Sequence, residues 1–375
     1  MIRVLQISSD YVYTDLYKKL FQALLGIGCG LRLYCPVVDS FCEPRDSGGA
    51  VDEAISPCFH FWDRGLFYRK QRKIIRDLCG KEEIGSYDLI HSHFLFTNGN
   101  TALELKKRYG VPYITAVRNT DINEFFKYML HLRRKGLEVL KEAERVVFLS
   151  GAYQRKVLKY VPVHLRKEIL DKSVIIPNGL DPFWLENKNG PRKALTAKDE
   201  IHLVFAGEVN RNKNVEAVIK AALYLQKKGL RIRLTVAGTL KSRKIGMEME
   251  RHPWISYVGR QDKRGLLGCF REGDIFVMPS RRETFGLVYG EAMSQGLPVI
   301  YTRGEGFDGQ FPEGAAGFSV DPGDPAEIGE KILEIAANYK EISDNCPALA
   351  QRFDWNDIAK EYMEIYKEII EGKNE

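Results

Sequence analysis

Two successive series of strand-length apolar runs alternating with helix-period segments restrict the fold of this 375-residue chain more than any other feature. In residues 15–25, for example, Leu16, Leu20 and Leu24 recur at helical spacing. Alternation of this kind predicts a parallel sheet with helices on both faces. The strand candidates of the first series are Met1–Ser9, Leu31–Val38, Tyr87–His93, Val111–Val117, Arg145–Ser150 and Ser173–Pro177.

The second series follows turn residues at 178–182 and a polar segment at 187–198 that is typical of a linker. The sequence therefore predicts two facing Rossmann-like domains, residues 1–185 and 199–350, and a C-terminal segment, 351–375, whose helix packs back towards the first domain. The strand candidates of the second series are Ile201–Ala206, Arg231–Ala237, Ile255–Val258, Asp274–Met278, Pro298–Tyr301 and Gly317–Val320, and the longer helical patterns are 123–143, 215–228, 325–339 and Trp355–Ile370.

Composition excludes several other classes of protein. With 44% hydrophobic and 28% charged residues, the chain resembles neither a disordered, a collagen-like nor a disulfide-scaffold protein. Seven cysteines, an odd number without a CxxC pair, favour a reducing compartment. The opening residues MIRVLQISS do not resemble a signal peptide, and no run reaches the roughly 20 apolar residues of a membrane span. We therefore expect a cytoplasmic protein, at most peripheral on the inner face of the membrane.

Positive charge is concentrated in the first half of the chain. Residues 1–185 hold 28 Lys and Arg against 21 Asp and Glu, whereas the remainder is nearly balanced. This asymmetry indicates either an anionic partner or a moderately basic surface. The basic and aromatic segment 61–78 fits a helix lying on an anionic membrane or a core-facing helix with a solvated basic face. No RNA-recognition motif accompanies it, so no nucleic-acid partner is expected.

The most informative stretch is 274–300, DIFVMPSRRETFGLVYGEAMSQGLPVI. It predicts a buried strand, a loop through Gly286, and a helix over 287–294. Gly286 lets the backbone approach a ligand, and amides at the start of a helix favour an anion such as phosphate. Glu283 and Glu291 bracket this start; carboxylates there fit the hydroxyls of a sugar or ribose, although Glu283 alone also fits a solvated loop residue.

This stretch resembles the E-x7-E element of the retaining glycosyltransferases of family 4. Residues 175–181, IIPNGLD, resemble the linker motif of that family, and residues 205–214, FAGEVNRNKN, resemble its phosphate loop. The resemblance implies an α/β GT-B fold, a nucleotide-sugar donor as substrate rather than cofactor, and transfer with retention and without an obligatory metal. It also implies an acceptor in the first domain and the donor in the second.

The resemblance also implies roles for individual residues. Lys213 contacts the donor diphosphate, Glu283 lies near the sugar, Glu291 binds the ribose, and Arg260 borders the base. Lys213, Glu283 and Arg211 are the expected catalytic residues. Gly207, Glu208, Thr284, Phe285, Gly286 and Leu287 complete the expected donor site. The residues expected to line the acceptor side or the cleft are Thr14, His93, Arg118 and Asp121.

Three positions depart from the family pattern. Arg118 stands where a histidine is common, Glu208 stands where many members have arginine, and the loop at 8–14 lacks paired glycines. Arg211 could replace the missing cation. These departures leave open a nucleotide-sugar-binding subunit without activity.

Electrostatics support the assignment of Lys213 to the donor diphosphate independently of the family resemblance. Negative charge develops on the departing diphosphate during glycosyl transfer, and the chain contains no DxD motif to hold a metal there. A lysine together with a helix start can provide the necessary positive charge.

Two further motifs have simpler explanations. His91 and His93 share a strand face without further metal ligands, which fits packed residues or a strand-end histidine in the cleft. Residues 26–30, GIGCG, follow a helix and precede a strand, the reverse of the dinucleotide fingerprint.

The sequence therefore predicts a hexosyltransferase for surface polysaccharide or lipid-linked glycan synthesis, with a saccharide or lipid-linked acceptor. The alternatives are a sugar-nucleotide epimerase on the same fold, which would need no acceptor, and the inactive binding subunit. A glycoside hydrolase is less consistent with two carboxylates on one loop-helix element.

Overall fold

The computed structural model describes residues 1–41, 52–189, 195 and 200–372. The chain divides into two compact units: residues 1–179 together with 355–375 (unit 1), and residues 180–354 (unit 2). The first division falls before 185 because Trp184 of the short helix α7 (Pro182–Glu186) packs on Phe270 within unit 2. The expected linker at 187–198 lies, apart from 187–189 and 195, outside the described residues, as does Cys42.

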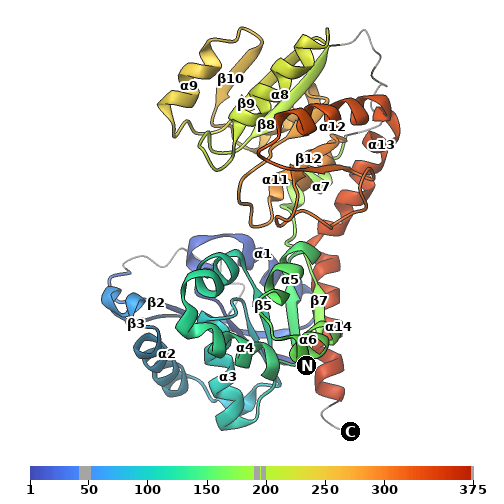
Figure 1. Ribbon diagram of the computed structural model, residues 1–375. Coiled ribbons are helices and arrows are strands. Elements are labelled where there is room, and N and C mark those ends of the chain that lie inside the picture. The colour runs from blue at the N-terminus through green and yellow to red at the C-terminus, as the bar shows by residue number, and fades with distance from the viewer. Residues whose placement is uncertain (42–51, 190–194, 196–199, 373–375) are drawn as a thin grey trace. The chain divides into compact units, whose positions relative to one another are not determined.

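Unit 1 is built on a parallel sheet of seven strands in the order β3-β2-β1-β4-β5-β6-β7 (Figure 1). Alternate residues of its central strands enter different apolar clusters: Leu5 and Ile7 belong to one cluster, whereas Val4 belongs to the other. This burial on both faces explains why the strands are continuous apolar runs. The strands are β1 (Arg3–Ile7), β2 (Gly30–Val38), β3 (Asp52–Phe59), β4 (Leu89–Ser92), β5 (Tyr113–Val117), β6 (Arg145–Phe148) and β7 (Ser173–Ile175).

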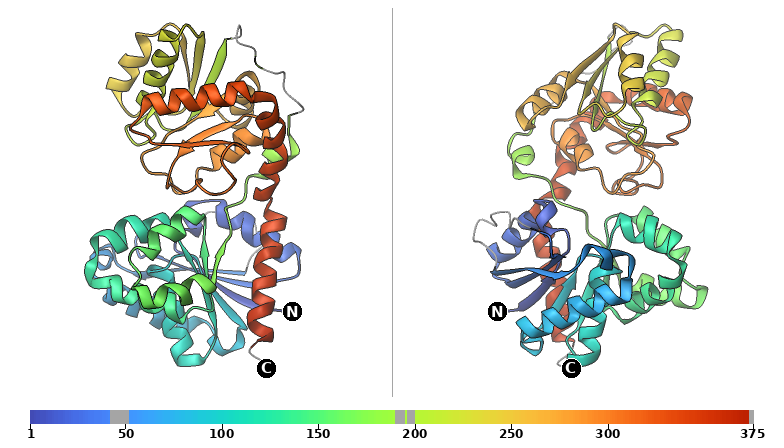
Figure 2. Two further views of the ribbon diagram at one scale, coloured as in Figure 1. Left: turned by 45° about the vertical axis from the view of Figure 1, so that its right-hand side comes forward. Right: turned by 90° about the vertical axis from the view of Figure 1, so that its left-hand side faces the viewer.

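Helices cover both faces of this sheet, and the C-terminal helix is among them. Helix α14 lies beside α1, and its Trp355, Ile358 and Tyr366 join the cluster that contains Val4 (Figure 2). The helices of unit 1 are α1 (Leu16–Gly26), α2 (Phe67–Lys81), α3 (Thr97–Tyr109), α4 (Arg133–Glu142), α5 (Gly151–Leu158), α6 (Val163–Asp171) and α14 (Trp355–Glu371).

Unit 2 contains a parallel sheet of six strands in the order β10-β9-β8-β11-β12-β13. Its strands are β8 (Ile201–Ala206), β9 (Ile232–Ala237), β10 (Ile255–Gly259), β11 (Ile275–Val277), β12 (Val299–Thr302) and β13 (Gly317–Val320). Besides α7, its helices are α8 (Val215–Lys227), α9 (Arg243–Glu250), α10 (Lys263–Glu272), α11 (Leu287–Ser294), α12 (Pro325–Ala337) and α13 (Tyr339–Leu349).

Three elements differ from the sequence-based expectation. Strand β3 was not predicted; it is the edge strand of its sheet and contains Pro57, which only an edge position tolerates well. The helical pattern at 123–143 is interrupted, because a π-helical turn at Asp121–Phe126 and a 3₁₀ turn at Leu130–Leu132 precede α4. The pattern at 325–339 ends at Ala337, and α13 begins at Tyr339.

Candidate active site

The loop between β8 and α8 positions Lys213. The backbone N–H of Lys213 donates to Asn210 Oδ1 at 2.9 Å, which turns the chain just before the helix. Asn214, the residue before α8, has a left-handed backbone with φ of 63°. Its buried side-chain amide donates to the carbonyls of Pro279, at 3.0 Å, and Pro322, at 2.8 Å. This network fixes the start of α8 against the segments that follow β11 and β13.

Asn212 joins this loop to the loop that precedes α11. Its side-chain amide donates to the Arg282 carbonyl at 3.0 Å, and its side-chain oxygen accepts from the Arg282 N–H at 3.1 Å. The Arg281 N–H donates to the Asn212 carbonyl at 2.7 Å. Two loops that are 70 residues apart are therefore held as one rigid surface.

Lys213 and Glu283 meet on this surface. Lys213 Nζ lies 2.6 Å from Glu283 Oε2, and their side chains are 24% and 10% exposed. Ser280 Oγ donates to the same carboxylate oxygen at 3.2 Å. The Glu283 N–H donates to Glu305 Oε2 at 2.9 Å, and its carbonyl accepts from the Gly306 N–H at 3.1 Å. The pair is thus oriented by several contacts and still reaches solvent.

Gly286 forms the start of α11. It has φ of 76°, a left-handed conformation that disfavours residues with a side chain. A Cβ at this position would lie 2.4 Å from the Tyr289 ring, whose hydroxyl is anchored to the Met278 carbonyl at 2.6 Å. The predicted helix over 287–294 is confirmed by α11. The Tyr289 N–H bonds back to the Gly286 carbonyl at 3.0 Å. The first two amides of a helix, here those of Leu287 and Val288, have no acceptor within it, and they lie directly after the Glu283 loop.

The other residues expected at the donor site differ in how closely they approach Lys213 and in how exposed their side chains are. A Cβ built on Gly207 would lie 3.7 Å from the Lys213 side chain, which shows how closely the two approach. Phe285 is buried, Thr284 is exposed, and Leu287 and Glu291 are half-buried on α11. Glu208, Arg211 and Arg260 are exposed, and Glu208 accepts a hydrogen bond from Asn210 Nδ2 at 3.0 Å.

In unit 1, Asp121 is a buried anchor for the loops that follow β4 and β5. Its carboxylate accepts from the N–H groups of Leu95 and Phe96, both at 3.1 Å, and of Arg118 at 2.9 Å. Burial raises the pKa of Asp121 to about 6 despite these donors. The carboxylate therefore fixes these two loops, and Asp121 also lines a pocket of unit 1.

Arg118 lies beside this anchor. Its guanidinium donates to the His93 carbonyl and to Asn178 Oδ1, both at 3.2 Å, and lies over the Tyr17 ring. Thr14 is half-buried and accepts from the Leu16 N–H at 3.2 Å, so it sits at the start of α1.

The expectation that His93 lines a cleft disagrees with its position, because its side chain is fully buried inside unit 1. His93 Nε2 lies 2.8 Å from Gln6 Oε1, and its ring packs on Tyr17 and on His91. His91 Nδ1 in turn lies 2.7 Å from the Tyr366 hydroxyl of α14. Burial lowers the pKa of His91 to about 3, and burial and His91 hold the pKa of His93 well below its usual value. The packed alternative fits both histidines.

A pocket of about 310 Å³ lies at the carboxyl end of the sheet of unit 1, and we call it the edge pocket. Burial lowers the pKa of Lys70 and raises the pKa of Asp10, and the two residues interact electrostatically. Sequence reasoning missed both residues because the pocket depends on β3, which was not predicted. No local pattern marked Lys70, which reaches the pocket from α2. The polar residues of this pocket include Ser9, Asp10, Arg64, Lys70, Thr97 and Thr120.

The described residues form neither a metal cluster nor a membrane-spanning helix. Over residues 1–41, 52–189, 195 and 200–372, no three His, Cys, Asp or Glu side chains are placed to hold a metal ion. Over the same ranges, no helix combines the length and the apolar character that crossing a bilayer requires.

Comparison with known families gives matches in both units. A family model described as glycosyl transferases group 1 matches residues 187–351, and one described as Glycosyltransferase Family 4 matches residues 20–183. The chain is 28% identical over 311 residues to a D-inositol 3-phosphate glycosyltransferase of Arthrobacter sp. (strain FB24), covering 76% of this chain and 72% of that protein. It is 24% identical over 320 residues to an uncharacterized glycosyltransferase of Methanocaldococcus jannaschii, covering 82% of each.

Solved structures share the arrangement of strands and helices. Sucrose-phosphate synthase from Thermosynechococcus elongatus superposes with a TM-score of 0.70 at 20% identity, covering 99% of this chain and 100% of that chain. Anabaena HepE in complex with UDP superposes with a TM-score of 0.71 at 16% identity, covering 98% and 100%. At such identities the likeness concerns the fold.

Proposed function

This chain belongs to family 4 of the glycosyltransferases and has the GT-B fold, and from this premise we propose that it transfers a hexosyl unit from a nucleotide diphosphate sugar to an acceptor hydroxyl with retention of configuration. The observation that carries the proposal is the Lys213–Glu283 pair beside the start of α11, held on two loops that Asn212 joins.

The donor diphosphate would bind at this surface. As the bond between the anomeric carbon and the phosphate oxygen breaks, its electron pair stays on the departing diphosphate. The Lys213 ammonium and the amides at the start of α11 stabilise that charge. Glu283 holds the ammonium in place and offers its second oxygen to a sugar hydroxyl, while Glu291 is assigned to the ribose. Front-face attack and a covalent intermediate both begin with this departure, so the assignment applies to either route.

Metal independence is part of the proposal. Lys213 provides a fixed positive charge where many phosphate-transferring sites use a divalent cation. Turnover in excess EDTA should therefore match turnover in Mg²⁺, whereas a loss of activity in EDTA would contradict this part.

The edge pocket is the proposed acceptor end. Its cations, Lys70 and Arg64, fit an anionic group on the acceptor, and its carboxylates, Asp10 and Asp121, fit hydroxyls. The printed name of the Arthrobacter relative, D-inositol 3-phosphate glycosyltransferase, describes an acceptor of this chemistry. A phosphorylated polyol and a phosphate-linked saccharide of a lipid-linked glycan or surface polysaccharide both meet the requirement.

The first test is a thermal-shift screen of the full chain against UDP-, GDP-, ADP- and dTDP-sugars, since a ligand of the folded state raises its melting temperature. The donor found is then incubated with inositol phosphates and with lipid-linked saccharides, and NMR reports the anomeric configuration of the product. Stabilisation followed by retained transfer supports the proposal. Inverted product, an epimer formed from donor alone, or binding without transfer to any acceptor would contradict it.

A further inference from the structure

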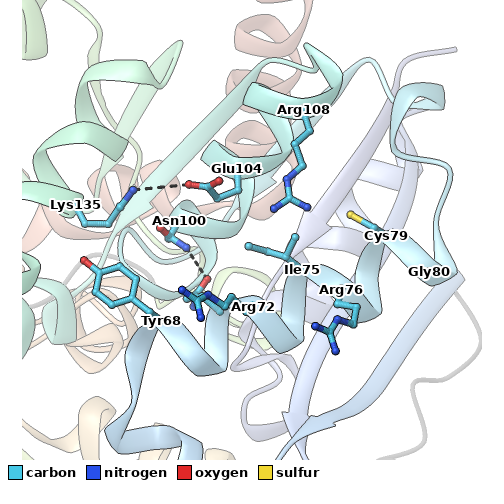
Figure 3. A pocket seen from close by; sticks show the side chains of 11 residues that line it. Tyr68, Arg72, Ile75, Arg76, Cys79, Gly80, Asn100, Glu104, Arg108 and Lys135 are labelled. Carbon is cyan, nitrogen blue, oxygen red and sulfur yellow. Dashed lines mark hydrogen bonds and ion pairs between the residues drawn. The ribbon is translucent and has the colours of Figure 1, made fainter.

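A second hollow in unit 1, of about 700 Å³, runs between α2 and α3 and reaches α4, and we call it the arginine groove (Figure 3). Its lining shares no residue with the edge pocket. Figure 3 shows the Arg108 guanidinium extending from α3 over Ile75 towards α2. The charged residues of the lining are Arg72, Arg76, Arg108, Lys135 and Glu104.

The three arginines differ from their neighbours in their electrostatic partners. On α2, Arg69 and Lys73 pair with Asp63, and Lys81 pairs with Asp77 at 3.0 Å. Within the part of the chain that the structure describes, none of the groove arginines has a carboxylate in ion-pair range. Of the remaining α2 cations, Lys70 lines the edge pocket, whereas Arg72 and Arg76 line the arginine groove together with Arg108 from the last turn of α3.

Lys135 and Glu104 close the groove on the α4 side. Lys135 Nζ lies 2.8 Å from Glu138 and 3.7 Å from Glu104, so this part of the lining is already neutralised. The excess positive charge therefore lies at the arginines, on α2 and the C-terminal end of α3.

The floor of the groove is rigid. Gln71 is almost fully buried, donates to the Thr97 carbonyl at 2.9 Å, and accepts from Asn100 and Thr101, both at 3.0 Å. Ile75 is buried beside it. The three arginines are exposed, and they project from helices whose separation is fixed by these contacts.

We infer that the arginine groove binds a phosphate group at a site separate from the donor and acceptor sites. Guanidinium groups donate paired, parallel hydrogen bonds that match phosphate oxygens, and several of them together favour a dianion over a monovalent ion. The phosphate could belong to a soluble phosphomonoester or to the headgroup of an anionic lipid, since the chemistry of recognition is the same.

The experiment uses the full chain and two probes. Glycerol 3-phosphate tests the soluble source by calorimetry, and vesicles with phosphatidylglycerol, compared with phosphatidylcholine alone, test the lipid source by co-sedimentation. The parent should bind at least one probe, and the combined variant Arg72→Gln, Arg76→Gln, Arg108→Gln should bind it at least about tenfold more weakly. Binding of glycerol 3-phosphate assigns a soluble ligand, and binding of the vesicles alone assigns a lipid headgroup.

A matched control removes the same net charge elsewhere in unit 1. Arg134, Lys159 and Lys167 are exposed and lie outside the groove lining, so their combined change to Gln should leave affinity within about twofold. Equal losses in both triple variants, an unchanged affinity in the groove variant, or no binding of either probe by the parent would overturn the inference.

Circular dichroism reports whether the groove variant folds. If it does not, a single substitution still tests the inference. Glu104→Gln removes the carboxylate of the lining and should tighten binding by about two- to fivefold. Unchanged or weaker binding by this variant counts against the inference. None of these residues belongs to the proposed donor or acceptor sites, so the outcome is independent of the proposed transferase activity.

Discussion

Lys213 and Glu283, 70 residues apart in the chain, place an ammonium and a carboxylate 2.6 Å apart at the start of α11. The contact joins the loop after β8 to the loop after β11, the two segments whose sequences carry the family resemblance. An incoming diphosphate would therefore meet a cation that is already oriented, so little reorganisation is needed at the moment of reaction.

Replacing Lys213 should chiefly affect turnover. Lys213→Ala removes the positive charge proposed to face the departing diphosphate, and loss of one such preorganised contact typically lowers kcat by about 10²–10³. Steady-state kinetics with the donor found in the screen measure the effect. Lys220→Ala, which changes an exposed lysine of α8, is the matched control and should leave kcat nearly unchanged. A Lys213→Ala enzyme within about threefold of the parent would refute the assigned role.

The ion pair also predicts non-additive kinetics. Lys213→Met and Glu283→Gln each disturb the same pair, so the double variant should lose less than the sum of the two single losses, with a coupling of about 1–3 kcal/mol. A cycle of kcat/KM values for the parent, both single variants and the double variant measures this coupling. Strict additivity would show that the two residues act separately.

Alanine substitutions at Gly286 and Gly304 distinguish the cost of backbone strain from the cost of a steric clash. Both have positive φ, but a Cβ on Gly304 meets open space, whereas one on Gly286 would lie 2.4 Å from Tyr289. Gly304→Ala should lower the free energy of unfolding by about 1–2 kcal/mol. Gly286→Ala should cost about 1–3 kcal/mol more, because the buried ring must move. Urea denaturation measures both values, and equal costs would contradict the described packing.

Burial of His91 predicts a pH-dependent stability. Its pKa is about 3 in the folded protein and near 6.5 in the unfolded chain, so between these values the unfolded chain holds one more proton. The contribution of His91 to the free energy of unfolding is therefore fully present above about pH 6.5. It falls by about 1.4 kcal/mol per pH unit as the pH drops towards 3. His91→Gln should unfold with a shallower acid dependence than the parent. Parallel pH profiles of the two proteins would disprove this account.

The edge pocket predicts a selective effect on the acceptor. Lys70→Gln removes a mostly buried cation, so the KM for an anionic acceptor should rise about tenfold, since hydrogen bonds to charged groups contribute about 1.5–3 kcal/mol. The dissociation constant of the donor should stay unchanged. An acceptor KM equal to that of the parent, or an equal loss of donor affinity, would exclude Lys70 from the acceptor end.

The sequence predicted the elements of the fold well where a local pattern identifies them. Fully buried strands are continuous apolar runs, and α11 follows from the glycine before it. Strand β3 escaped prediction because its polar residues and Pro57 are tolerated only at a sheet edge. The π-helical turn at Asp121–Phe126 keeps a helical spacing of residues while it interrupts the helix.

The candidate site was predictable mainly in its residue types. The expected position of Lys213 near the start of α11 agrees with its contact to Glu283, although the roles of both residues stay predictions. The contacts of Asn212 and Asn214 could not be predicted, because side-chain bonds to the backbone of a distant loop leave no local pattern. His93 was misplaced because strand alternation does not reveal which residues at strand ends are covered by helices. Tyr17 and Phe21 of α1 pack on the His93 ring, and α14 contacts the neighbouring His91.

Unit 2 is inserted in the sequence between the two segments of unit 1, and this insertion limits how homologous chains can recombine. The Leu180 N–H donates to the Phe353 carbonyl at 2.8 Å, so the two ends of unit 2 are adjacent, and Trp355 packs on Gly179 within unit 1. A single genetic crossover near residue 180 would give a chimera whose first sheet carries a terminal helix from another parent. Recombination that preserves the buried contacts of α14 requires two breakpoints, one on each side of unit 2. The inserted segment is then inherited as a whole.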